Sequence, residues 1–204
     1  MPLFSENMTT PSGSLFLARL TDALERREPK AFEEEGARRA AVAVVVTQQQ
    51  DAALLFVKRR EREGDPWSGH IAFPGGHAEP GESPRATAER ETLEETGLAL
   101  ARVGRPLGRL DDVYPRSVYL PKIIVTPMVF AVPSRLDVSP SEEIERAVWV
   151  QAEDVFDRAN RKPFVLRRPS GMLEFESIHV AGLVIWGLTE RILGQIATAI
   201  ESTS

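Results

Sequence analysis

The most informative stretch of this 204-residue sequence runs from Gly76 to Leu98 and reads GHAEPGESPRATAERETLEETGL. Residues 83–96 favour a helix, because Pro84 fits an early helical turn and Gly97 ends the pattern. On that helix three glutamates fall at positions i, i+3 and i+4 and share one face: Glu91, Glu94 and Glu95. Like charges at this spacing repel one another, which indicates that another group compensates them.

The residue types near this face favour a divalent metal ion. Arg90 can reach Glu94 one turn later, but one arginine does not neutralise three carboxylates together with Glu82. The sequence has no cysteine and only three scattered histidines, so a zinc site is not expected. A carboxylate cluster suits Mg²⁺ or Mn²⁺, which take oxygen ligands and leave room for water and substrate phosphates. The alternative is an ordinary solvated, glutamate-rich helix face.

This stretch resembles the Nudix box. Eight positions over 23 residues match it with the correct spacing: Gly76, Glu82, Arg90, Glu91, Glu94, Glu95, Gly97 and Leu98. Thr92 departs from the pattern, which has an aliphatic residue there, and we expect a packing adjustment without loss of metal binding. The resemblance implies an α/β (α+β) fold, namely an α/β/α sandwich with a mixed central sheet and a catalytic loop-helix-loop.

The resemblance also implies an activity and a set of site residues. The activity is Mg²⁺- or Mn²⁺-dependent hydrolysis of the diphosphate bond of a nucleoside diphosphate derivative. The metal ligands and catalytic residues on the helix are Glu91, Glu94 and Glu95, and the Gly76 carbonyl is a further ligand. Glu82 and Arg90 hold the loop and the helix together as an ion pair. The general base is a helix glutamate or a glutamate of a later loop, where Glu142 and Glu143 are candidates. The alternative for that loop is an ordinary polar turn.

Residues 54–76 resemble the coenzyme A pyrophosphatase branch of this family, with paired leucines, an arginine-rich stretch and the sequence FPGG. The loop is about two residues longer than in that branch, and Asp65 stands where an arginine is expected. The candidate substrate-binding residues are Arg59, Arg60, Arg62 and Trp67. Arginines suit phosphate groups, and a tryptophan can stack on a base. The alternatives are a solvated basic loop and a tryptophan packed against the domain.

The branch resemblance implies coenzyme A or acyl-coenzyme A as substrate, with 3′,5′-ADP and (acyl-)4′-phosphopantetheine as products. Two alternatives stay open. The first is a Nudix hydrolase of ADP-ribose, dinucleotides or (d)NTPs. The second is a Nudix domain that senses nucleotides without catalysis.

Composition sets the broad class. A hydrophobic fraction of 42% fits a globular chain and excludes disorder of the whole protein. The sequence has no apolar run of about 18 residues and no signal-like N-terminus, and its net charge is −5. We therefore expect a cytoplasmic protein that binds a small molecule and neither nucleic acid nor membrane, with a homodimer as an open alternative.

Residues 1–36 are interpreted as an N-terminal helical extension and linker, and residues 37–204 as the Nudix hydrolase domain. Ser14 is expected to cap a helix with Leu15, Leu17, Leu20 and Leu24 near one face. Residues 180–200 are expected to form a long apolar helix, in which Trp186 is interpreted as a core residue. A short helix is expected at 152–158. The predicted strands are residues 40–47, 53–58, 101–110, 122–132, 147–150, 164–167 and 172–175.

Overall fold

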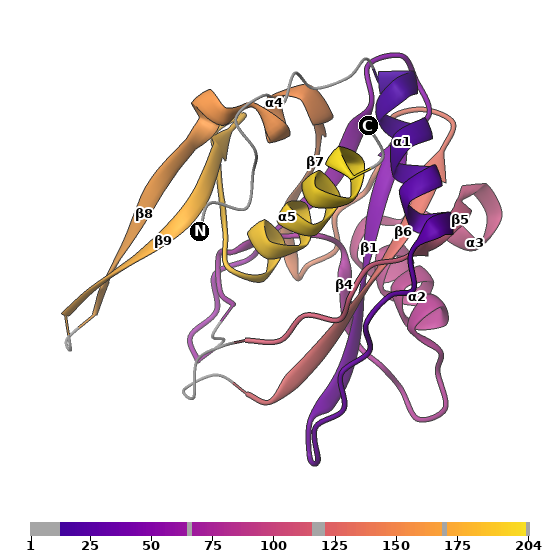
Figure 1. The fold of residues 1–204 in the computed structure, drawn as a ribbon. Coiled ribbons are helices and arrows are strands. Elements are labelled where there is room, and N and C mark those ends of the chain that lie inside the picture. Colours follow the sequence, from indigo (N-terminus) through magenta and orange to yellow (C-terminus); the bar gives the residue numbers. More distant parts are fainter. Residues whose placement is uncertain (1–12, 65–66, 116–120, 169–170, 203–204) are drawn as a thin grey trace.

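The computed structural model describes residues 13–64, 67–115, 121–168 and 171–202 (Figure 1). Within these residues one mixed sheet has seven strands: β1 (Arg38–Thr47), β2 (Ala53–Arg59), β3 (Ile71–Ala72), β4 (Gly75–His77), β5 (Arg105–Arg109), β6 (Ile123–Val132) and β7 (Ile144–Gln151). Strand β1 pairs in parallel with β6 and antiparallel with β2 and β4. The pairing with β4 fixes the glycines of that strand against the central strand of the sheet.

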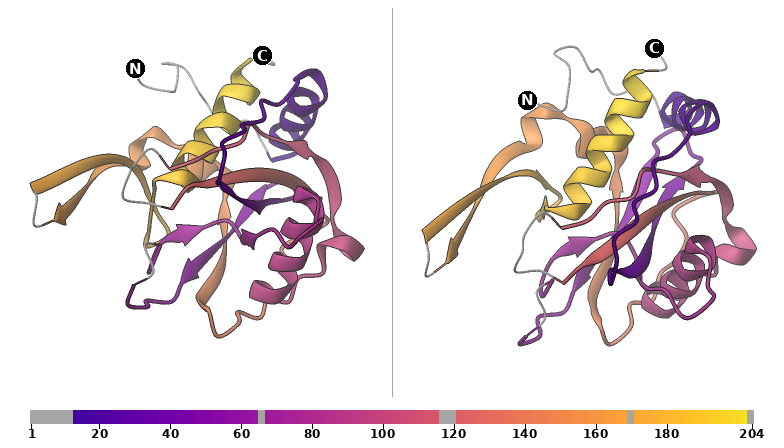
Figure 2. Two further views of the ribbon diagram at one scale, coloured as in Figure 1. Left: turned by 90° about the horizontal axis from the view of Figure 1, so that it is seen from below. Right: turned by 60° about the horizontal axis from the view of Figure 1, so that its bottom comes forward.

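Helices cover both faces of this sheet (Figures 1 and 2). Their bounds are α1 (Gly13–Arg26), α2 (Pro84–Thr96), α3 (Leu100–Val103), α4 (Ala152–Phe156), the 3₁₀ turn η1 (Arg158–Asn160) and α5 (Leu188–Glu201). Helices α1, α4 and α5 pack on one face, and α2 and α3 pack on the other. The predicted α/β/α sandwich with a mixed central sheet is confirmed. Of the helices in the described ranges, none is both long and apolar enough to cross a membrane.

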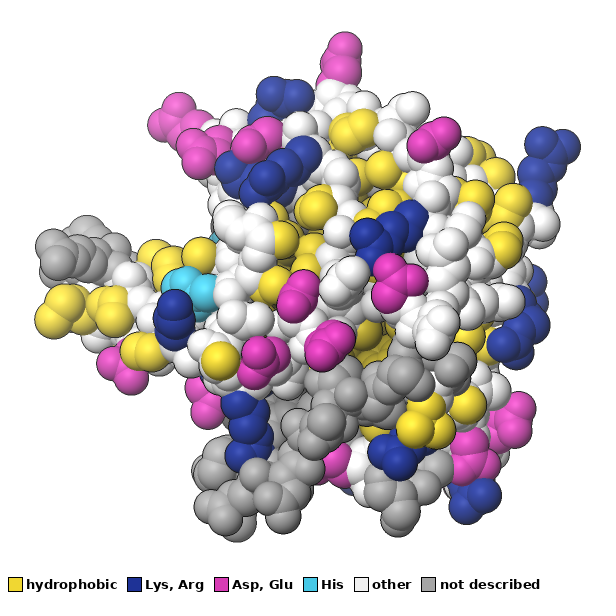
Figure 3. All heavy atoms as spheres, turned by 90° about the horizontal axis from the view of Figure 1, so that it is seen from above, with side chains coloured by type: hydrophobic (Ala, Val, Ile, Leu, Met, Phe, Trp, Pro, Cys, Tyr) yellow, Lys and Arg dark blue, Asp and Glu magenta, His cyan; other side chains and the backbone are white. Residues whose placement is uncertain are grey.

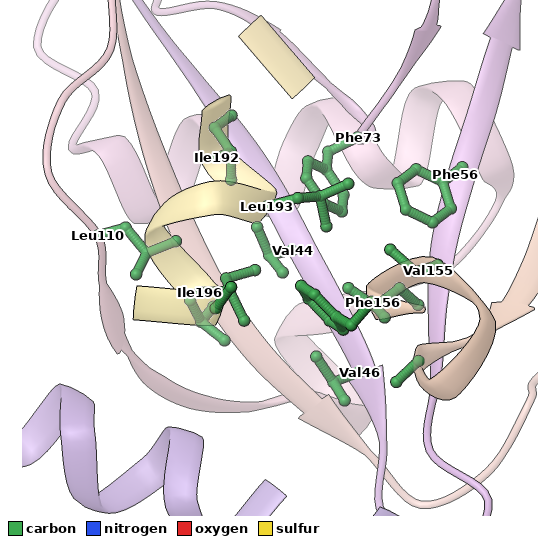
Figure 4. Close-up of a cluster of buried hydrophobic side chains, with 14 of the residues drawn as sticks. Val44, Val46, Phe56, Phe73, Leu110, Val155, Phe156, Ile192, Leu193 and Ile196 are labelled. Atoms are coloured by element: carbon green, nitrogen blue, oxygen red, sulfur yellow. The ribbon is translucent and has the colours of Figure 1, made fainter. Parts of the chain in front are cut away.

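Strand β1 supplies apolar side chains to both cores, because successive residues of a strand point to opposite faces. Val44 and Val46 belong to the cluster that includes Ile192 and Ile196 of α5 (Figure 4). Ala41, Ala43 and Val45 of β1 belong to the cluster on the opposite face of the sheet, which includes Ala88 of α2. A continuous apolar run therefore places this strand in the middle of the sandwich, as expected for a strand buried on both faces.

Three further strands among the described residues form a second, antiparallel sheet: β8 (Arg161–Arg168), β9 (Gly171–Val180) and β10 (Leu183–Trp186). Strands β8 and β9 project from the body of the protein as a two-stranded arm (Figures 1 and 2). At the base of the arm, Arg161 Nη1 lies 3.1 Å from Glu190 Oε1, and both side chains are largely buried. This ion pair connects β8 to α5.

The predicted helix over residues 180–200 is wrong in its first third. Val180 ends β9, residues 183–186 form β10, and the helix begins only at Leu188. Gly182 and Gly187 both have a φ of 71°, in the left-handed region that suits glycine and interrupts a helix. The sequence is largely apolar on both sides of these glycines, so its pattern does not mark the change from strand to helix.

Two smaller predictions also need correction. Residues 101–103 of the predicted strand 101–110 belong to helix α3, and β5 begins only after Gly104. In α1, Leu15 is exposed, whereas Phe16 is buried with Leu20. The helix begins at Gly13, one residue before the predicted cap.

Helix α1 packs against α5 and β5, and Leu20 is fully buried in the larger core. We therefore predict that Leu20→Ala lowers the free energy of unfolding by about 2–5 kcal/mol, as expected for loss of a buried leucine. Leu15→Ala is the matched control on the exposed side of the same helix, and we expect little change. Urea denaturation measures both variants, and equal effects would contradict a structural role for α1 in the core.

Candidate active site

Helix α2 has defined signals at both ends. The Ser83 hydroxyl accepts a hydrogen bond from the Ala86 N–H at 3.2 Å, and Pro84 occupies the first turn. At the other end, Gly97 adopts a φ of 71° and its N–H donates to the Leu93 carbonyl at 2.9 Å. The buried Thr92 hydroxyl donates to the Ala88 carbonyl at 2.6 Å, so a threonine at this position leaves no unpaired polar group. These contacts fix which residues of the helix face the sheet.

Arg90 binds the loop that precedes the helix. Its Nε and Nη2 atoms lie 2.8 and 3.0 Å from the two carboxylate oxygens of Glu82, and Nη2 also donates to the His77 carbonyl at 2.9 Å. Glu82 accepts further hydrogen bonds from the Glu79 N–H and the Thr87 hydroxyl, each at 2.9 Å. Arg90 and these donors lower the pKa of Glu82 to about 2. The loop and the helix are therefore held together by a charged, bidentate pair.

The third nitrogen of the same guanidinium faces the acidic side of the helix. Arg90 Nη1 lies 3.0 Å from Glu91 Oε1 and 3.1 Å from Glu94 Oε2. One arginine thus joins the loop, through Glu82, to two of the three predicted metal ligands.

The three glutamates occupy different depths. The Glu94 side chain is 57% exposed, whereas Glu95 is buried. Glu95 accepts a hydrogen bond from the Gly75 N–H at 3.0 Å, and Arg59 Nη1 lies 3.8 Å from its carboxylate. Burial outweighs these two contacts and raises the pKa of Glu95 to about 7, and burial also raises the pKa of Glu91. Burial therefore disfavours the ionised forms of the two inner carboxylates.

The glycine pair of β4 lies between the sheet and the helix with no room for side chains. A Cβ atom on Gly76 would lie 2.4 Å from the Glu91 carboxyl carbon, and one on Gly75 would lie 2.3 Å from the Ala41 carbonyl oxygen. Gly75 also has a φ of 156°, a conformation that other residues rarely adopt. This close approach places backbone polar groups directly beside the Glu91 carboxylate.

The possible ligands between α2 and β4 fit a hard divalent cation. They are glutamate carboxylates and backbone groups, with no cysteine, and oxygen ligands of this kind are the ones that Mg²⁺ and Mn²⁺ prefer. The contact of Arg90 Nη1 with Glu91 and Glu94 shows that a positive charge is accommodated between them. In the described part of the chain no three acidic or histidine side chains already converge on one point. A bound ion therefore requires these carboxylates to turn toward it.

A cleft of about 870 Å³ opens beside the glycine pair. It is lined by Gly75, Gly76 and His77 of β4 and also by Phe175 and Trp186 of the second sheet. Trp186 is half-buried and lines the cleft, so its interpretation as a pure core residue is incomplete. The cleft connects the edge of the acidic face to the projecting arm.

The structure separates the predicted substrate-binding residues into two groups. Arg59 and Trp67 line the cleft. Arg60 and Arg62 are exposed, and their guanidinium groups contact the loop of residues 141–144: Arg60 Nε donates to the Glu142 carbonyl at 2.9 Å. Asp65 lies outside the described residues.

Glu143, the predicted alternative base, lies on a loop that contacts the end of α2. The Ser141 N–H donates to the Glu95 carbonyl at 3.0 Å, and Arg62 Nη1 lies 3.1 Å from Glu143 Oε1. The structure thus brings Glu143 near the acidic face, with an exposed carboxylate that is paired to an arginine.

Sequence reasoning missed several residues of the cleft. His70 and Phe175 line it together with Trp186, and the His70 ring centroid lies 4.4 Å from that of Trp186. The sequence carries only a partial signal for Phe175: it lies in a predicted strand and follows Leu173 at a spacing of two, but Val165 and Met172 break a strict alternation. The contact of β10 with β3 beside the cleft is a tertiary feature that no local sequence pattern predicts.

Comparison with known proteins agrees with this geometry. A model of the NUDIX domain matches residues 37–169. The chain therefore belongs to the Nudix family.

The relatives of the chain show how far the likeness extends. An uncharacterized protein of Schizosaccharomyces pombe is 34% identical over 104 residues, which are 48% of this chain and 32% of the relative. The match thus spans about a third of that protein. A MutT/nudix family protein from Enterococcus faecalis has a TM-score of 0.52 at 16% identity and covers 88% of this chain and 67% of its own. A C. elegans Ap4A hydrolase has a TM-score of 0.46 at 22% identity, with 58% and 82% covered. The Enterococcus faecalis structure shows the shared fold.

The bond between Arg90 and Glu82 generates a prediction about acid stability. The folded-state pKa of Glu82, about 2, lies below its usual value of 4.5. Its contribution to stability is therefore present above pH 4.5 and is lost as the pH falls toward 2. We expect Glu82→Gln to lower the melting temperature by a few degrees at pH 7 and by much less near pH 3. Thermal unfolding across this pH range measures it, with Glu79→Gln as the control from the same loop. A difference that persists at low pH would contradict the role of the charged pair.

Proposed function

We propose that this protein hydrolyses the diphosphate bond of coenzyme A or acyl-coenzyme A and releases 3′,5′-ADP and (acyl-)4′-phosphopantetheine. The observation that carries the proposal is the meeting of three elements at one place: the glutamate face of α2, the close-packed glycines of β4 and a large cleft that opens beside them. An acidic helix face alone is compatible with simple solvation, whereas this arrangement of carboxylates and close-packed glycines beside a cleft suits diphosphate chemistry.

In this proposal Mg²⁺ is held by Glu91, Glu94, Glu95 and the Gly76 carbonyl. When bound, the ion neutralises the diphosphate and lowers the pKa of a coordinated water. Arg90 keeps the loop and the helix in register, so that Gly76 stays beside Glu91. Mn²⁺ has the same ligand preference and is expected to substitute for Mg²⁺.

We assign proton removal and substrate binding to residues around the acidic face. Removal of a proton from the attacking water is assigned to a helix glutamate or to Glu143, which lies on the loop bonded to the end of α2. Arg59 lines the cleft next to Glu95 and is the arginine best placed to bind an anionic group of the substrate. Trp67 lines the same cleft, whereas the guanidinium groups of Arg60 and Arg62 bind the 141–144 loop.

Support for coenzyme A rests on the sequence before the box and on the lining of the cleft. Residues 54–76 resemble the coenzyme A pyrophosphatase branch, and their arginine Arg59 lines the cleft. Much of the lining is apolar, as Val42, Phe73 and Leu188 illustrate. A substrate with phosphates at one end and a less polar arm at the other fits this division.

A substrate screen tests the proposal. Purified protein with Mg²⁺ is given coenzyme A, ADP-ribose, NADH, dinucleoside polyphosphates and nucleoside triphosphates, and the products are separated by chromatography. We expect coenzyme A to give the highest kcat/KM. Faster hydrolysis of ADP-ribose or of a dinucleotide would replace the substrate assignment. Binding of nucleotides without hydrolysis of any would indicate a sensor.

The metal assignment yields a second prediction. Glu94→Gln removes one negative ligand while leaving the size of the side chain, and we expect kcat/KM to fall on the order of 100-fold or more. The matched control is Glu89→Gln, because Glu89 lies on the same helix and pairs with Arg85 at 2.7 Å instead of with Arg90. Steady-state kinetics at several Mg²⁺ concentrations measure both variants. An unchanged rate for Glu94→Gln would show that Glu94 is not a ligand.

A further inference from the structure

The arm formed by β8 and β9 has one apolar face. Residues that pair across an antiparallel ladder point to the same side of the sheet. Phe164 pairs with Phe175, and the next pair on the same side, two residues along, is Leu166 with Leu173. We call these four residues the apolar arm face. The space-filling view shows hydrophobic side chains on the projecting arm, at its left (Figure 3).

The opposite side of the arm has a different character. Two apolar residues there are paired with charged ones: Pro163 with Glu176, and Val165 with Glu174. Such mixed pairs are typical of a strand surface that faces solvent. The sequence of the arm thus distinguishes its two sides.

The apolar arm face continues into the catalytic cleft. The rings of Phe164 and Phe175 have their centroids 4.9 and 5.0 Å from that of Trp186, and Trp186 in turn contacts His70. Leu173 and Phe175 line the same cleft as Gly76. The apolar arm face is therefore an outer wall of the cleft that contains the proposed diphosphate site.

Packing within the protein does not account for the outer part of this wall. Leu173 is 46% exposed, although it faces the cleft side of the arm. The arm is held at its base by the pair of Arg161 with Glu190 and by the packing of its aromatic residues on Trp186. Leu173 therefore offers apolar area at the cleft that an apolar group of a bound molecule would remove from water.

We propose that the apolar arm face, together with Trp186, binds an unbranched apolar chain that the substrate carries on the far side of its diphosphate. This inference rests on the proposed function, in which acyl-coenzyme A is such a substrate. The rings of Phe164 and Phe175 each lie about 5 Å from that of Trp186, which leaves no room for a planar base between either ring and Trp186. Beyond them the wall is aliphatic, which suits a chain.

The charges along the cleft orient such a substrate. Arg59 lines the cleft beside Glu95, whereas the apolar arm face carries no charged side chain. Phosphate groups are attracted to Arg59 and not to the apolar arm face. The uncharged tail of the substrate is therefore directed toward the arm.

Isothermal titration calorimetry without added metal tests the inference independently of catalysis. The probes are free coenzyme A and its acetyl, hexanoyl and dodecanoyl thioesters. We expect Kd to fall by at least about twofold for every two carbons added, because each buried methylene favours binding. A Kd that does not depend on chain length overturns the inference.

A pair of variants tests where the acyl chain of the substrate binds. Leu173→Asp places a charge on the apolar arm face, and Val165→Asp places one on the opposite side at almost the same exposure, 46% against 45%. We expect Leu173→Asp to weaken dodecanoyl-coenzyme A binding about tenfold while free coenzyme A binding stays near wild type, and Val165→Asp to change neither. Thermal unfolding confirms that both variants fold. Equal effects of the two variants overturn the inference.

The outcomes separate the two proposals. If Kd depends on the length of the acyl chain but no hydrolysis follows when Mg²⁺ is added, the proposed activity fails and the acyl-chain site stands. Hydrolysis of coenzyme A without chain dependence means the reverse. A second copy of the protein is the competing occupant of the wall. If sedimentation shows that Leu173→Asp abolishes a wild-type dimer while chain dependence is unchanged, the wall is a subunit contact and the inference is wrong.

Discussion

The arrangement of the acidic face depends on one guanidinium group. Arg90 binds Glu82 through two nitrogens, the His77 carbonyl through one of these, and the Glu91 and Glu94 carboxylates through the third. A lysine has no planar fork and could not make these contacts at once. Because the same side chain fixes the loop and pairs with the proposed ligands, the position of the backbone before the helix and the charge on the helix are set together.

A second constraint is steric and acts from the sheet. Gly75 and Gly76 pair with β1 on one side and meet α2 on the other, so that any side chain at either position would collide with backbone or with Glu91. The central strand thus determines where the loop passes. The glycine pair is a structural requirement for bringing a backbone segment within contact of a carboxylate, independently of any metal.

The extent to which the sequence predicted this protein follows from the range of the interactions. Helix α2 was predictable because Ser83 and Gly97, its two ends, act within a few residues of themselves. The segment 180–200 was not, because strand β10 exists only through its pairing with β9. In the site, the spacing of the glutamates placed them on one face, but it could not show that Glu95 is buried, since depth depends on the sheet beneath. The same limit applies to Trp186, whose position beside the cleft requires the second sheet.

The negative net charge of this protein is in apparent conflict with an anionic substrate. A chain with a net charge of −5 and an acidic helix face is not an obvious receptor for a polyanion. Burial raises the pKa of Glu91 and Glu95, so their ionised forms are costly without a cation, and Arg59 lies beside Glu95. In the proposed function, a bound ion and Arg59 would supply positive charge for the phosphates, and the apolar lining of the cleft would select a substrate by its uncharged part.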